Sequence, residues 1–544
     1  MIFLRKSPVW LVTLLVAALA AGLHFYFLSH AGGFWRDEVN LLNLSSRSSF
    51  GEMQKDSFPL LMPLLIHGWL DLGWGEASLR WLGLAIGLGI LAALGLASWK
   101  INRAPPLLGL ALFGLNSTLI IFGDSLRAYG LGCLFIVLVV FCGAYFLQRP
   151  CWSRVVWLAV TSVLSVQTLY HNAILVGAVC VGTMLVCAGR RNWPAVVQVF
   201  SAGAVAALSL LPYVPNFIVT QADSATLRTG LKLPRLLAGF TDLFGFPAAQ
   251  YTWIWAALGI GLLAHGWLAL RRRHAVAGAT AGEISRNELV LFAAATVTAS
   301  FVGFFIFLWL AAFPSQAWYF LPLMAVTVTC LDFTWPFWNH RLRLALMAFF
   351  FASTVLAVPA TTRLLAYRFT NVDLWTQHMK PYVAPGDYVV VVPWFCGITF
   401  GHYLENRVAW DTLPPLADHA THRFDLVKAQ LQNTNAILPV LQKISTALQS
   451  GNRVWILSLK GWMDVPEPGT TAAATLPPAP SPRWGWSEVP YTTVWVSQVA
   501  HLIGEQSTQF ARVQNPAVAG PFIEDTELFL AAGWRGEVKS APAK

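Results

Sequence analysis

Runs of about 20 apolar residues recur along most of this chain, and they limit its possible folds more than any other feature. Hydrophobic residues make up 56% of the chain and charged residues only 11%. A water-soluble protein could not bury that much apolar surface, so we expect an integral membrane protein. Eleven spans are predicted, near residues 8–29, 78–99, 107–123, 129–147, 155–170, 173–189, 196–213, 251–270, 289–312, 318–336 and 344–360.

Basic residues are expected to mark the cytoplasmic side of these spans. If the N-terminus is cytoplasmic, every second connection should carry Lys or Arg. All five such connections do, with Lys100 and Arg103, Arg149 and Arg154, Arg190 and Arg191, Arg271 to Arg273, and Arg341 and Arg343. These loops account for the formal net charge of +10, so no nucleic-acid partner is predicted. The predicted location is a bacterial inner (cytoplasmic) membrane, with the C-terminal tail in the periplasm.

The chain is expected to divide into a transmembrane domain, residues 1–360, and a soluble extracytoplasmic domain, residues 361–544. Strand signals at 386–394 and 453–459 and a helix signal over 425–450 predict a small α/β fold for the tail. Residues 466–482, rich in Pro, Ala and Thr, predict a flexible loop. The fold class is therefore a polytopic α-helical membrane protein with a small α/β C-terminal domain.

Two outer loops are longer than a connection needs. The first, residues 30–77, contains an apolar stretch, 58–70, which is interrupted by proline and too short to span. The second contains LPRLLAGFTDLFGF, residues 233–246. Both stretches predict helices that lie in the outer membrane interface.

The motif FWRDEVN, residues 34–40, places two adjacent acids just outside the first span. Asp37 and Glu38 could simply begin a solvated loop or cap a helix. They could also be a general base for an acceptor hydroxyl, ligands of a divalent metal (Mg, Mn or Zn), or both.

A second motif, FGDSLRAYGL, lies between the third and fourth spans on the same predicted side. Arg127 has a planar guanidinium that suits a phosphate, but it could equally anchor the interface or pair with Asp124. His171, Asp56 and His67 fall on that side too, and either histidine could be a hydrogen-bonded structural residue. The topology would bring these side chains to similar depth, which favours one outward-facing polar site.

Three stretches in order resemble the GT-C superfamily of integral-membrane glycosyltransferases, in particular the protein O-mannosyltransferase and aminoarabinose transferase branch. They are the Trp-Arg-Asp-Glu run at 35–38, the segment from Ser57 to Leu88, and SLRAYGL at 125–131. The likeness covers roughly the first 180 residues. Relatives often have an acid two positions before the arginine of the third stretch, where this chain has Ser125.

The resemblance implies an inverting transfer of a sugar from a polyprenyl-phosphate donor to an acceptor hydroxyl outside the cytoplasm. It implies Asp37 and Glu38 as catalytic or metal-site acids and Arg127 as a ligand of the lipid phosphate. Tyr129 belongs to the same Arg-x-Tyr segment, and the residues proposed to bind substrate are Arg127, Tyr129, Asp56, His67, His171 and Asp124.

The sequence leaves the acceptor open among a glycan, a lipid and a protein. Two other classes also fit the topology. A secondary transporter would place ionisable groups near mid-membrane in broken helices, and a lipid or polysaccharide ligase would share the spans without the same catalytic acid.

Overall fold

The computed structural model describes residues 8–47, 49–54, 58–216, 218, 233–273, 284–311, 316–404, 408–465, 476–477, 487–518, 520 and 522–536. By its contacts the chain forms two compact units. The membrane unit comprises Met1–His30, Ser48–Phe217 and Leu231–Ala366, and the sheet unit comprises Ala31–Arg47, Ile218–Gly230 and Tyr367–Lys544. The start of the predicted first outer loop therefore belongs to the sheet unit by its contacts.

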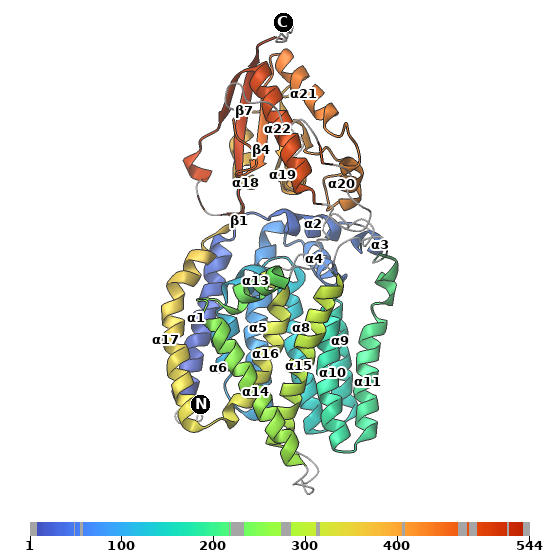
Figure 1. The fold of residues 1–544 in the computed structure, drawn as a ribbon, viewed down its shortest axis with the longest axis vertical. Coiled ribbons are helices and arrows are strands. Elements are labelled where there is room, and N and C mark those ends of the chain that lie inside the picture. The colour runs from blue at the N-terminus through green and yellow to red at the C-terminus, as the bar shows by residue number, and fades with distance from the viewer. Residues whose placement is uncertain are drawn as a thin grey trace. The chain divides into compact units, whose positions relative to one another are not determined.

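The membrane unit is helical throughout its described residues (Figure 1). Its long helices are α1 (Pro8–His30), α5 (Leu79–Asn102), α8 (Ala128–Gln148), α9 (Trp152–Val166), α10 (Asn172–Gly189), α11 (Trp193–Leu208), α14 (Tyr251–Arg273), α15 (Arg286–Ala311), α16 (Leu321–Thr334) and α17 (His340–Leu365). The shorter elements are α3 (Phe50–Met53), α4 (Leu61–Asp71), η2 (Glu76–Ser78), α6 (Leu107–Gly109), η3 (Leu110–Gly114), α7 (Ser117–Gly123), η4 (Leu211–Tyr213), α13 (Leu233–Phe244), η6 (Ala317–Phe320) and η7 (Trp335–Phe337).

Nine helical segments within the described residues are long and apolar enough to cross a membrane, and α9 is a shorter apolar helix. These ten segments match ten of the predicted spans, and the chain is an integral membrane protein. Every residue of α16 is buried, so this helix forms the centre of the unit. It packs against α5, α8 and α15, while α1 and α17 pack against each other.

The span predicted at 107–123 is helical but is not one continuous α-helix. The structure has α6, a π-helical turn (η3) and α7 in its place. Asn116 begins α7 by accepting the backbone N–H of Thr118 at 2.9 Å, and its amide donates to the carbonyl of Leu243 at 3.1 Å. The buried carboxylate of Asp332 accepts the N–H groups of Leu108 and Gly109 at 3.0 and 2.9 Å. Asp332 thus satisfies backbone N–H groups at the start of α6, and Asn116 does so at the start of α7, as an apolar environment requires.

The sheet unit contains a five-stranded sheet in the order β3-β2-β4-β7-β5. The strands are β2 (Tyr388–Val392), β3 (Ala409–Thr412), β4 (Val454–Leu459), β5 (Ser507–Arg512) and β7 (Thr526–Trp534); β1 (Arg368–Thr370) and β6 (Phe522–Glu524) pair separately. β2 is parallel to β3 and β4, and β7 is antiparallel to β4 and β5. All five residues of β2 are buried, as expected of a central strand covered on both faces.

Helices cover both faces of this sheet. They are α18 (Val372–Met379) and α19 (Cys396–Leu404) on one face and α21 (Leu438–Gln449) and α22 (Val489–Gln506) on the other, with α20 (Phe424–Leu431) beside them (Figure 1). The predicted helix over 425–450 is two helices, because the chain turns at Asn433 to Asn435 between α20 and α21. Most of the predicted loop at 466–482 lies outside the described residues. The small α/β fold predicted for the tail is confirmed.

Candidate functional site

Helix α2 (Arg36–Ser45) carries the two predicted catalytic acids and belongs to the sheet unit. Glu38 is fully buried, and its carboxylate accepts the backbone N–H of Trp35 at 3.4 Å, at the start of the helix. The side chain of Asp37 remains 24% exposed. Of the two acids, Asp37 is therefore the one that a substrate can approach.

Arg36 and His422 both approach the Asp37 carboxylate. Nε of Arg36 and Nε2 of His422 each lie 3.6 Å from Oδ1 of Asp37. The Arg36 guanidinium also stacks over the Phe395 ring at 4.2 Å and lies 3.8 Å from the buried Glu524 carboxylate. The Arg36 guanidinium, which is always charged, favours the ionised form of Asp37, which is the form a general base needs.

The metal-binding role predicted for Asp37 and Glu38 remains a prediction. Consecutive helical positions do not face each other, and the Glu38 carboxylate bonds to the backbone of Trp35. Among the residues that the structure describes, no group of three or more His, Cys, Asp or Glu side chains could hold a metal ion. Asp56 lies outside the described residues.

Arg127 and Tyr129 come together at the start of α8 in the membrane unit. Arg127 is the N-cap residue, is 5% exposed, and stacks over the Phe58 ring at 4.4 Å. Tyr129 contacts the same ring edge-on at 5.5 Å and stacks with Tyr319 at 6.1 Å. A buried guanidinium over an aromatic ring at a helix N-terminus provides both charge and backbone N–H groups for an anion.

Asp124, at the end of α7, holds the turn that precedes Arg127. Its carboxylate lies 2.9 and 2.7 Å from Nδ1 of His24, a residue of α1. Gly87 of α5 makes room for this pair, since a Cβ atom there would lie 2.1 Å from the Asp124 carboxylate. In this structure Asp124 positions the turn instead of facing a ligand directly.

The two other predicted histidines have partners of their own. His67 lies on α4, is 40% exposed, and pairs with Asp71 at 3.4 Å. His171 precedes α10, and its ring meets Phe304 edge-on at 5.6 Å. Their substrate-binding roles remain predictions.

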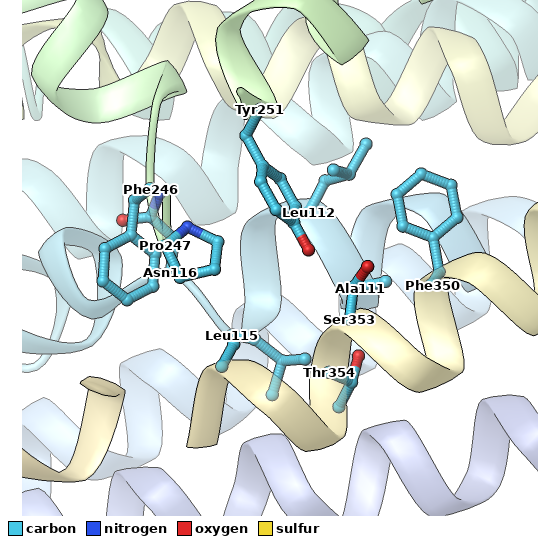
Figure 2. A pocket seen from close by; sticks show the side chains of 11 residues that line it. Ala111, Leu112, Leu115, Asn116, Phe246, Pro247, Tyr251, Phe350, Ser353 and Thr354 are labelled. Atoms are coloured by element: carbon cyan, nitrogen blue, oxygen red, sulfur yellow. The ribbon is translucent and has the colours of Figure 1, made fainter. Parts of the chain in front are cut away.

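A cleft in the membrane unit lies between η3, α17 and the residues around the start of α14 (Figure 2). Apolar side chains dominate its lining, among them Leu112, Leu115, Phe246 and Phe350. Tyr251 points its hydroxyl into the same space (Figure 2). None of the lining residues is charged.

Sequence reasoning missed His24, Arg36, His422 and Glu524. A lone histidine inside an apolar run, such as His24, was a signal that an internal partner exists. His422 gave no local signal, because its loop meets α2 across 382 positions of sequence.

No family model matches the chain, and no curated protein matches it by sequence. Solved structures similar to it include ArnT from Cupriavidus metallidurans bound to undecaprenyl phosphate, with a TM-score of 0.45, 14% identity, and coverage of 84% of this chain and 94% of that one. Another is the archaeal oligosaccharyltransferase AglB from Archaeoglobus fulgidus in complex with an inhibitory peptide and a dolichol-phosphate, with a TM-score of 0.47, 10% identity, and coverage of 98% and 75%.

Both are GT-C superfamily membrane glycosyltransferases, the family that the sequence motifs resemble. At these identities and TM-scores the matches assign no donor, acceptor or residue role to this chain.

Proposed function

We propose that this protein is an inverting glycosyltransferase that moves a sugar from a polyprenyl-phosphate donor to an acceptor hydroxyl on the extracytoplasmic face of the membrane. The observation that carries the proposal is the state of Asp37: a partly exposed carboxylate at the start of a helix, held between Arg36 and His422. That environment favours an ionised carboxylate, the form that can take a proton from an attacking hydroxyl.

Arg127 is proposed to bind the phosphate of the donor. A guanidinium that is nearly buried against an aromatic ring attracts a phosphate more strongly than one in water, because the local dielectric constant is lower. As the bond from the anomeric carbon to the phosphate oxygen breaks, negative charge grows on the leaving phosphate. Arg127 would stabilise that charge.

The test uses the full-length protein in nanodiscs with a panel of polyprenyl-phosphate sugars. Release of the polyprenyl phosphate is measured with membrane lipids, glycans or peptides as acceptors. Asp37→Ala should abolish turnover while the donor still raises the Tm. Glu505→Ala, which removes a 53% exposed acid of the same sheet unit, should retain activity. Full turnover in Asp37→Ala would remove the base from the proposal.

A further inference from the structure

The loop after β3, residues 413–423, contacts helix α2 through two hydrogen bonds. The amide nitrogen of Asn43 donates to the carbonyl of Ala420 at 2.6 Å, and the amide oxygen of Asn40 accepts the backbone N–H of His422 at 2.9 Å. Asn40 is 1% exposed, so its bond is shielded from water. These contacts fix the backbone of His422 relative to the helix that carries Asp37.

Aromatic neighbours fix the plane of the His422 ring. The ring is nearly parallel to that of Phe424, with centroids 5.8 Å apart and an angle of 10°, and nearly perpendicular to that of Trp394, at 6.1 Å and 88°. In this orientation Nε2 faces Oδ1 of Asp37 at 3.6 Å. Both side chains keep partial access to solvent, at 18% and 24% exposure.

The other charged groups around this pair have strong partners. Arg36 lies between Asp37 and Glu524. Arg423, the neighbour of His422, bonds to Asp418 at 3.0 Å and Asp425 at 2.6 Å. Glu488 accepts the indole N–H of Trp394 at 2.7 Å. Glu524 and Asp37 also interact as like charges, and Arg36 contacts both carboxylates.

We propose that His422 is a positioning residue of the active site, through which the C-terminal tail completes the catalytic centre. It holds the Asp37 carboxylate in one orientation and keeps it ionised. This inference rests on the proposed function. In the reaction, the acceptor O–H proton passes to Asp37, the oxygen bonds to the anomeric carbon, and the bond to the phosphate oxygen breaks with its electron pair going to the phosphate. His422 remains unchanged in this step.

The first experiment compares the pH dependence of kcat/KM in the wild type, His422→Ala and His422→Gln. The alanine variant should lose about tenfold or more in kcat with little change in donor KM. Its acid limb should move to higher pH, because Asp37 protonates more easily without a nearby cation. His422→Gln should restore part of kcat because the glutamine side chain refills the space of the imidazole. Its acid limb should stay at the higher pH, because glutamine carries no charge.

His419→Ala is the matched control from the same loop. Its ring packs against Trp410 at 4.4 Å, and its loss should leave the acid limb in place. If both alanine variants lose activity equally and neither moves the limb, His422 is only structural and the inference fails.

A second measurement needs no turnover. The pH dependence of diethyl pyrocarbonate modification at His422, read by peptide mass spectrometry, gives the pKa of that imidazole in the intact protein. Asp37→Asn should lower this pKa, because the carboxylate no longer favours the protonated ring. If the wild type turns over its donor but the pH profile of His422 modification is the same in Asp37→Asn, the inference is overturned. If the profile shifts in Asp37→Asn but the wild type turns over no polyprenyl-phosphate sugar, the pairing of His422 with Asp37 is upheld and the proposed function is overturned.

Discussion

His24 Nδ1 lies 2.7 Å from Oδ2 of Asp124, joining α1 to the turn between α7 and α8 in the interior of the membrane unit. His24 is fully buried and Asp124 is 4% exposed. Arg127 follows Asp124 by three positions and caps α8. The pair therefore fixes the turn from which the proposed phosphate ligand extends.

Replacing His24 tests this role. His24→Ala leaves a buried carboxylate without its imidazole partner, which should destabilise the protein by about 1–3 kcal/mol. The measurement is thermal unfolding in detergent. His30→Ala, at the more exposed end of the same helix, should lower the Tm less. Equal Tm values for the two variants would contradict the role given to the pair.

Gly87 should be intolerant of any side chain. A Cβ there would lie 2.1 Å from Oδ1 of Asp124 and 2.6 Å from Nδ1 of His24, so Gly87→Ala should destabilise by about 1–3 kcal/mol. Gly89, on the same helix, is the control, because its Cβ would meet only Leu134 at 3.5 Å. Gly89→Ala should be neutral or stabilising. A well-folded Gly87→Ala protein with wild-type Tm would show that the two helices separate easily.

Arg127→Ala should weaken donor binding roughly 10- to 100-fold, since a hydrogen bond to a charged group contributes about 1.5–3 kcal/mol. The readout is the concentration of polyprenyl phosphate that produces half of the maximal Tm shift. Arg149→Ala, at the opposite end of α8, should bind as the wild type does. Unchanged affinity in Arg127→Ala would exclude this residue from the donor site.

The pH dependence of stability should respond to Glu524. Burial raises the pKa of its carboxyl above the usual range, and Arg36 offsets part of that shift. Because the pKa of Glu524 is higher in the folded state, its contribution to the free energy of unfolding is fully present below the unfolded-state pKa of about 4.3. That contribution is lost as the pH rises through the folded-state pKa. The Tm of Glu524→Gln should therefore fall less between acidic and neutral pH than the Tm of the wild type.

Glu505 provides the control for that experiment, because its side chain is 53% exposed. Glu505→Gln should keep the wild-type pH dependence. A Glu524→Gln curve parallel to the wild-type curve would show that Arg36 fully compensates for burial.

The sequence by itself determined the membrane spans, the α/β character of the tail and the placement of Asp37 and Arg127 beside span ends. These features follow from local patterns: apolar runs long enough to cross a bilayer, a continuous apolar strand such as Tyr388–Val392, and charges next to such runs.

Only the tertiary structure decided where the helices break and which side chains share a site. The break before Ser117 involves Asn116 and its partner Leu243, and the start of α6 is held by Asp332. The environment of Asp37 depends on His422 and Glu524, far away in sequence. Hydrogen bonds and ion pairs of this kind form between elements that packing brings together. Because the periodicity of one segment carries no record of its distant partners, these contacts could not be read from the chain alone.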